Sequence, residues 1–91
     1  MSDIQEKKNL LYIGDEEEPM AHLAFEEQDG EMIITSTVVD PDHRNQGLGT
    51  DLIDHAVNYA RKHKLIIDPA CPFAYEVMKD TPEYQVVMKE K

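Results

Sequence analysis

The succession of a strand, a glycine-containing loop, a helix and a second strand between residues 31 and 68 most constrains the fold. Residues 31–39, EMIITSTVV, are rich in β-branched residues, and 65–67, LII, form a second apolar run. Between them, from Leu48, the apolar positions follow helical spacing, at 48, 52, 53, 56 and 60. A crossover of this kind is right-handed, so we expect the two strands to lie parallel in one sheet.

The first strand of this crossover has apolar residues on both of its predicted faces. Alternation places Met32, Ile34 and Val38 on one face, and Ile33 and Val39 on the other. A strand that is apolar on both sides is typical of a sheet covered on both faces. We therefore expect this strand to be central and covered from both sides.

The segments around the crossover complete an α/β (α+β) domain. Residues 10–13 and 20–27 are predicted strands, and Asp29-Gly30 predicts a tight hairpin turn before residues 31–39, giving an antiparallel meander of about three strands. Proline at the first position and a polar residue before it predict two short C-terminal helices, after Cys71 and after Thr81. Residues 1–91 are expected to form a single domain, because separate cores need more chain.

The composition excludes several classes of partner. The formal net charge is -10, which disfavours nucleic acids and anionic membranes and favours a cationic partner. The chain has no apolar run long enough for a membrane span, no signal-peptide pattern, and a single cysteine, so a cytoplasmic protein is expected. A core of this size fits a monomer or a weak homodimer.

Gly47 and Gly49 lie between the predicted strand and the start of the predicted helix. The backbone N–H groups at a helix start can bind an anion, and glycine lets the anion approach closely. A phosphate loop of the Walker A kind is excluded, because no Gly-Lys-Ser/Thr follows Gly49. A dinucleotide fingerprint is excluded as well, because Leu52 stands at the third glycine and the loop after Val39 is too long. The remaining alternatives are another anion site and tight packing of the helix on the sheet.

The loop Arg44-Asn45-Gln46-Gly47-Leu48-Gly49 resembles the Arg/Gln-x-x-Gly-x-Gly/Ala motif of the GNAT superfamily of acetyl-CoA-dependent N-acetyltransferases. Three stretches in order, STVVDPDHRNQGLG, IDPACPF and TPEYQVVM, are similar to the short, single-domain GNAT-like family. The resemblance covers roughly residues 10–88 and implies a minimal GNAT-like fold. The chain departs from it at Ser36, Asn45 and Thr81, where relatives often have His, Gly and His.

The resemblance implies a set of residues that bind acetyl-CoA. Backbone N–H groups of the loop and the helix start would hold the CoA pyrophosphate, at Arg44, Asn45, Gln46, Gly47, Leu48, Gly49 and Thr50. The backbone of Thr37, Val38 and Val39 would pair with the pantetheine arm as an added strand. This binding uses the main chain, so the departures leave it intact.

Two residues are candidates for catalysis. Cys71 follows the second parallel strand and is the predicted N-cap of the next helix, where a thiol pKa is lowered. Resembling proteins carry a cysteine here as a candidate acetyl carrier or acid–base group; the alternative is a small buried residue. Because a tyrosine in GNAT enzymes sometimes protonates the departing thiolate, the resemblance makes Tyr75 a candidate acid. No metal site is expected, because the four histidines and one cysteine lack ligand spacing.

The expected function is acetyl-CoA-dependent transfer of an acetyl group to a primary amine. A chain this short lacks the elements that wall the acceptor pocket of longer relatives, so the acceptor site should be open and suit a protein or peptide amine. The alternative is a module that binds CoA or acetyl-CoA without turnover, which the absence of an evident general base favours.

Overall fold

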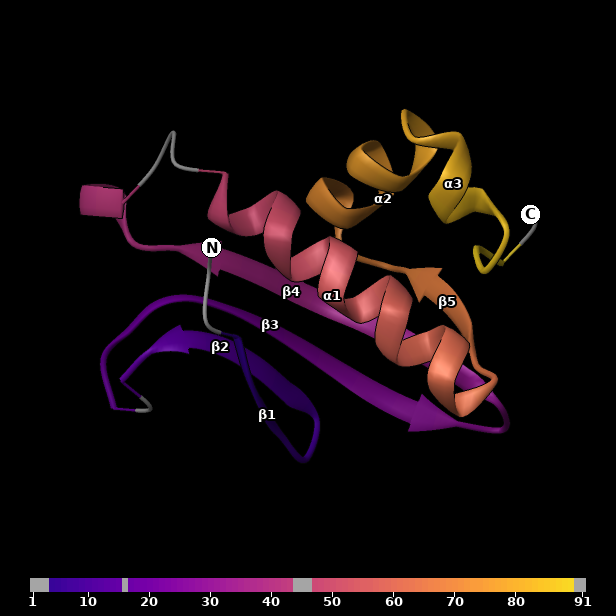
Figure 1. Ribbon diagram of the computed structural model, residues 1–91, viewed down its shortest axis with the longest axis horizontal. Helices are drawn as coiled ribbons and strands as arrows, with labels where there is room; N and C mark the ends of the chain where they lie inside the picture. The colour runs from indigo at the N-terminus through magenta and orange to yellow at the C-terminus, as the bar shows by residue number, and fades with distance from the viewer. Residues whose placement is uncertain (1–3, 16, 44–46, 90–91) are drawn as a thin grey trace.

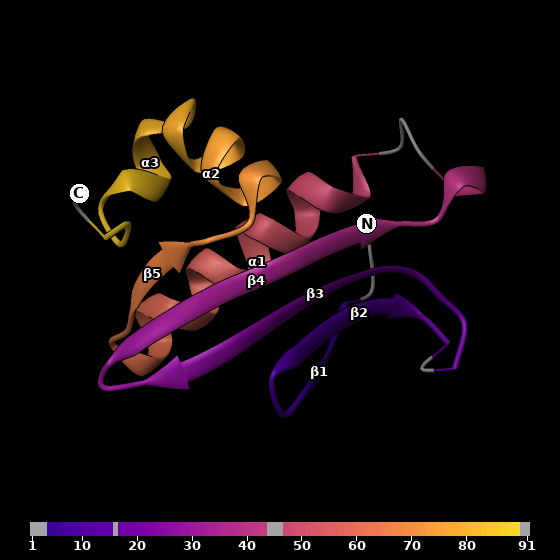
Figure 2. The same cartoon turned by 180° about the vertical axis from the view of Figure 1, so that it is seen from behind.

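A computed structural model describes residues 4–15, 17–43 and 47–89, which form one five-stranded sheet with helices on one of its faces (Figures 1 and 2). The strands lie in the order β1-β2-β3-β4-β5. Their bounds are β1 Ile4–Lys7, β2 Leu10–Gly14, β3 Pro19–Gln28, β4 Glu31–Val39 and β5 Ile66–Pro69. The helices are α1 Leu48–His63, α2 Pro72–Lys79 and α3 Pro82–Gln85, with a short 3-10 turn at Pro41–His43.

The chain order of the sheet agrees with the sequence. Strands β1 to β4 form an antiparallel meander, and β5 pairs with β4 in parallel after the α1 crossover. Asp29 and Gly30 have positive φ values of 53° and 81°, as a type I′ hairpin turn requires. Strand β1 was not predicted, because three of its four residues are exposed and its apolar pattern is too short to recognise.

The core lies between one face of the sheet and the apolar side of α1. Helix α1 buries Leu52, Ile53, Ala56 and Ala60 completely, as their spacing predicts. The sheet contributes fully buried residues from four strands, namely Leu11, Leu23, Phe25, Met32, Ile34 and Ile67. Helix α2 adds Ala74 and Met78 to the same cluster, so one continuous core supports α1, α2 and the sheet.

The prediction that β4 is covered on both faces is wrong. Met32 and Ile34 are fully buried, whereas Val38 is 47% exposed and Ile33 is partly exposed. In the described part of the chain all three helices lie on one side of the sheet, and the opposite side carries no helix (Figures 1 and 2). The apolar residues on that second face therefore cover the sheet surface without a layer above them.

The predicted faces of β4 also change along the strand. Ala24 of β3 pairs with Ser36 and Phe25 pairs with Ile34, so Thr35 is an extra residue without a partner in β3. A bulge of one residue exchanges the two faces of the strand beyond it. Val39, expected opposite Ile34, therefore lies on the same face and packs against the core.

The C-terminal segment returns to the outer edge of β5. The Ile67 N–H donates to the Val87 carbonyl at 2.6 Å, and the Lys89 N–H donates to the Ile67 carbonyl at 2.7 Å. The Tyr84 hydroxyl also donates to Asp54 Oδ1 on α1 at 2.9 Å. These bonds fix α2 and α3 beside α1. None of the helices in the described ranges has the length and apolarity needed to cross a membrane.

Neighbouring isoleucines of β5 test the one-sided core. Ile67→Ala should lower the free energy of unfolding by about 2–5 kcal/mol, because its side chain is fully buried. Ile66→Ala makes the same chemical change in the same strand, but Ile66 is 42% exposed on the open face, so a loss of about 1 kcal/mol or less is expected. Urea unfolding of both variants measures this, and equal losses would contradict the arrangement.

Candidate functional site

The site begins where β4 and β5 stop pairing. Their register ends with Ile34 beside Pro69, and the Cys71 N–H donates to the Ile34 carbonyl at 3.0 Å. Beyond this point β4 continues to Val39 and pairs only with β3 on its other side. A gap therefore opens along one edge of β4 between the carboxyl ends of two parallel strands, where open α/β sheets bind ligands.

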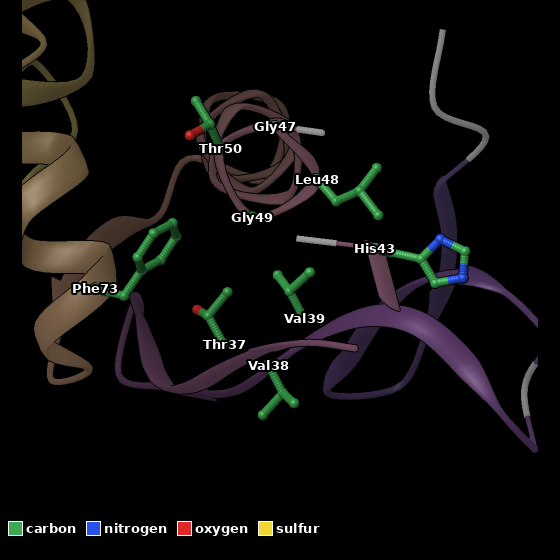
Figure 3. Close-up of a pocket in the computed structure, with 9 residues that line it drawn as sticks. All are labelled: Thr37, Val38, Val39, His43, Gly47, Leu48, Gly49, Thr50 and Phe73. Carbon is green, nitrogen blue, oxygen red and sulfur yellow. The ribbon is translucent and has the colours of Figure 1, made fainter. Parts of the chain in front are cut away.

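The backbone of β4 presents hydrogen-bonding groups to this gap. The Asp40 N–H donates to the Met20 carbonyl on β3 at 2.8 Å. Backbone groups alternate in direction along a strand, so those of Thr37 and Val39 point away from β3 and into the gap. Because of the bulge at Thr35, the side chains of Thr37 and Val39 point toward α1, and that of Val38 points to the opposite face (Figure 3).

The N-terminus of α1 lies opposite this edge of β4. Gly47 is the N-cap with a φ of 76°, and as a glycine it has no side chain to cap the helix. The first helical bond is donated by the Asp51 N–H to the Gly47 carbonyl at 2.9 Å. The N–H groups of Leu48, Gly49 and Thr50 therefore have no partner within the helix, and they form the positive end of its dipole.

Glycine is favoured at positions 47 and 49 for different physical reasons. Gly47 has a left-handed backbone with open space around the position of a Cβ, so its conformation requires glycine. Gly49 does not have a positive φ, but a Cβ there would lie 2.8 Å from Cζ of Phe73 and 3.5 Å from a methyl group of Val39. The packing alternative considered for the glycine pair thus describes Gly49, which makes room for an aromatic ring from α2.

These elements enclose a pocket of about 530 Å³. Figure 3 shows the nine residues that line it, which are Thr37, Val38, Val39, His43, Gly47, Leu48, Gly49, Thr50 and Phe73. None of the nine is acidic, although the chain has nineteen acidic residues. The pocket is mainly apolar, with backbone N–H groups at one end.

The predicted cofactor-binding residues converge on this pocket. Thr37, Val38 and Val39 line it from β4, and Gly47, Leu48, Gly49 and Thr50 line it from the start of α1. Arg44, Asn45 and Gln46, the rest of the predicted set, lie outside the described residues. Sequence reasoning did not assign Phe73 to the site, although the IDPACPF stretch that contains it was singled out.

Cys71 lies at the inner end of the gap, next to a pocket residue. It is the N-cap of α2, only 6% exposed, and its Sγ lies 3.8 Å from Oγ1 of Thr37. Burial raises the pKa of this thiol, but hydrogen bonds from the Ala74 backbone, the Thr37 side chain and the Phe73 and Thr37 backbones outweigh it, so the pKa is lowered. Phe73 and Ala74 belong to the first turn of α2, so the start of this helix contributes to lowering the pKa of the thiol.

The other candidate catalytic residue, Tyr75, lies in the first turn of α2. Tyr75 does not line the pocket. Residues two apart on a helix point in different directions, so Phe73 faces the pocket while Tyr75 does not. The Nζ of Lys79 lies 5.9 Å from the centre of the Tyr75 ring. Burial and a hydrogen bond to Asp54 raise the pKa of Tyr84 to about 12. Across the described residues there is no group of three or more His, Cys, Asp or Glu side chains placed to hold a metal ion.

Comparisons with known proteins agree on one family. The family model of GCN5-related N-acetyl-transferases matches residues 10–87. A GCN5-like protein from Staphylococcus aureus, assigned as an N-acetyltransferase and solved by NMR, is 30% identical, with a TM-score of 0.83 over 98% of this chain and 89% of its own. A search of curated proteins gave no match.

Two larger structures share the fold at lower identity. The ribosomal-protein-S18-alanine N-acetyltransferase of Escherichia coli is 22% identical, with a TM-score of 0.59 over 69% of this chain and 42% of its own. An acetyltransferase assigned to the GNAT family from Staphylococcus aureus is 17% identical, with a TM-score of 0.55 over 62% of this chain and 48% of its own. Both likenesses concern the fold.

A double-mutant cycle tests the contact between Gly49 and Phe73. Alanine has a higher helix propensity than glycine, by up to about 1 kcal/mol. In the wild type this gain should be cancelled, because the new Cβ displaces the Phe73 ring. In a Phe73→Ala background Gly49→Ala should stabilise the protein by about 1 kcal/mol, as measured by urea unfolding.

The matched control is Gly47→Ala, which should destabilise the protein by about 1 kcal/mol in both backgrounds, because its left-handed backbone is unaffected by Phe73. An identical effect of Gly49→Ala with and without the ring would contradict the packing role of Gly49.

Proposed function

The chain belongs to the family of GCN5-related N-acetyltransferases, and we propose that it transfers the acetyl group of acetyl-CoA to a primary amine of a protein or peptide. The observation that carries the proposal is one pocket with two complementary ends. Its outer end is the uncapped N-terminus of α1, and its inner end is the free edge of β4 beside Cys71.

The pyrophosphate and the pantetheine arm of acetyl-CoA would each have a chemical counterpart in this pocket. The pyrophosphate would accept hydrogen bonds from the N–H groups of Leu48, Gly49 and Thr50, where the helix dipole favours an anion. The amide-containing pantetheine arm would pair with the backbone of Thr37 and Val39, like a strand added to β4. This orientation directs the thioester toward the inner end, near Thr37. Arg44, Asn45 and Gln46 remain part of the proposed pyrophosphate loop.

In the direct form of the reaction, the nitrogen of a neutral amine attacks the thioester carbonyl carbon. The C–N bond forms, the C–S bond to CoA breaks, and the ammonium proton passes to the departing thiolate. Backbone N–H groups at the free edge of β4 would stabilise the oxyanion of the tetrahedral intermediate. Tyr75, which does not line the pocket, is our candidate for relaying this proton: its hydroxyl would give one proton to the thiolate and regain the one that the ammonium loses. A Tyr75→Phe protein that keeps the wild-type rate would remove this role.

A covalent form of the reaction would use Cys71. Its thiolate attacks the thioester, so that an S–C bond to Cys71 forms, the bond to CoA breaks, and CoA leaves with the proton released by the Cys71 thiol. The amine then attacks the Cys71 thioester, and its proton passes to the Cys71 sulfur as the S–C bond breaks. The lowered pKa of Cys71 and the contact of its Sγ with Thr37 support this form.

The acceptor is proposed to be a cationic protein or peptide. The net charge of -10 attracts basic chains, and the described residues place no helix over the second face of the sheet beside Val38. An open approach of this kind can admit an amine carried on a large molecule. The Escherichia coli neighbour is named for a ribosomal protein alanine, so this fold can serve a protein amine.

Calorimetric titration of acetyl-CoA tests the binding half of the proposal, and Gly49→Val in a Phe73→Ala background is the informative variant. The Phe73→Ala protein removes the ring that a side chain at position 49 would meet. If a phosphate approaches the backbone at Gly49, the added valine should still abolish binding. Equal affinity of the Phe73→Ala protein with and without valine would mean that Gly49 serves packing alone.

Intact-protein mass spectrometry tests the covalent form. Wild-type protein incubated with acetyl-CoA should gain one acetyl group, and Cys71→Ala should not. We expect Cys71→Ala to keep its affinity for CoA and to lose most transfer to a lysine-rich peptide. Full transfer by Cys71→Ala would leave the direct attack as the mechanism, and binding of acetyl-CoA without transfer to any amine would contradict the proposed function.

A further inference from the structure

Phe73 is an exposed aromatic residue at the site; Val38 is the other exposed large apolar residue that lines the pocket, but its side chain points to the opposite face of the sheet. Phe73 is 43% exposed, at the second position of α2, and it lines the pocket. Exposed aromatic surface in a pocket is normally covered when a ligand binds. The acetyl-transfer chemistry proposed above assigns no role to this ring.

The ring holds a defined position between the two helix starts. Its Cζ and Cε2 atoms lie 2.8 and 2.9 Å from the place where a Cβ of Gly49 would be, so the ring lies against the backbone of α1. In Figure 3 it stands on the same side of the pocket as Thr37 and extends toward α1. The absence of a side chain at Gly49 is what allows the ring to reach this far.

The ring reaches from the inner end of the pocket, where Phe73 follows Cys71, toward Gly49 at the start of α1. Thr37 and Phe73 both line the pocket, and Thr37 also contacts Cys71 at 3.8 Å, which marks the point where β4 and β5 separate. A thioester arm that runs from the start of α1 along Val39 to Thr37 ends next to this ring. In this pose the acyl group would be the part of the ligand that meets the Thr37 side of the ring.

We propose that Phe73 sets the acyl-chain length that the site accepts, restricting it to acetyl and similarly short acyl groups. This inference rests on the proposed function, since it concerns the thioester end of the same ligand. The ring limits the space available to the acyl group, and Gly49 fixes the position of the ring because it has no Cβ in the space that the ring occupies. A longer acyl chain would have to displace the ring from its contact with α1.

Binding of acyl-CoA thioesters tests this role of Phe73 without any need for an acceptor amine. The measured quantity is the ratio of the dissociation constants of butyryl-CoA and acetyl-CoA, obtained by calorimetry. The wild type should bind acetyl-CoA about a hundredfold more tightly than butyryl-CoA, since butyryl carries two more methylenes and each methylene rejected by an apolar pocket accounts for about a factor of ten. Phe73→Ala should lower the ratio by about tenfold, and Phe73→Leu should lower it less.

Ile66→Ala is the matched control, because Ile66 is exposed to the same extent, at 42%, but lies on the open face away from the pocket. It should leave the ratio unchanged. An unchanged ratio in Phe73→Ala, with acetyl-CoA still bound, would overturn the inference and leave the proposed function standing. Failure of the wild type to bind either thioester would overturn the proposed function and this inference with it.

Discussion

The separation of β4 from β5 is the constraint on which the site depends. The last bond between them joins the Cys71 N–H to the Ile34 carbonyl at 3.0 Å, and past it β4 has one edge without a strand. Backbone groups that are left unpaired inside a protein need a partner. The gap therefore presents polar backbone groups that can pair with a ligand, and the pocket of about 530 Å³ occupies it.

The same geometry explains how an acidic chain can hold an anionic substrate. A net charge of -10 opposes the approach of a pyrophosphate to most of the surface. The described lining of the pocket contains no acidic residue, and its polar end consists of N–H groups at the start of α1. These groups act only at short range, so in the proposed function the acidic surface would still attract a basic acceptor. The anionic substrate and the cationic acceptor would then be drawn to different parts of the molecule.

Sequence reasoning predicted the parts of this arrangement that depend on periodic apolar residues and on turn chemistry. It gave the α1 crossover, the Asp29-Gly30 turn, the position of Cys71 at the start of α2, and the set Thr37–Val39 and Gly47–Thr50 that meets in one pocket. Strand β1 was not predicted from the sequence, because its four residues are mostly exposed and the strand is stabilised by pairing with β2.

Two features of the site could not be predicted because they depend on contacts between distant residues. The bulge at Thr35 leaves no mark in the apolar pattern, yet it reverses the faces of Val38 and Val39 and thereby points Val39 at α1. The contact between Phe73 and Gly49 joins two helices across 24 positions of the chain (73 − 49 = 24). A glycine in a helix start can serve an anion, a turn or a neighbouring ring, and only the packing distinguishes them.

The most direct test of the central claim is the response of individual backbone amides to acetyl-CoA, measured by NMR with 15N-labelled protein. If the substrate lies between the free edge of β4 and the start of α1, the largest chemical-shift changes should fall on the amides of Thr37, Val39 and residues 47–50. The amides of β1 and of the hairpin at Asp29-Gly30 should remain unchanged. Changes confined to the open face of the sheet, or to the C-terminal segment beyond α3, would contradict the account.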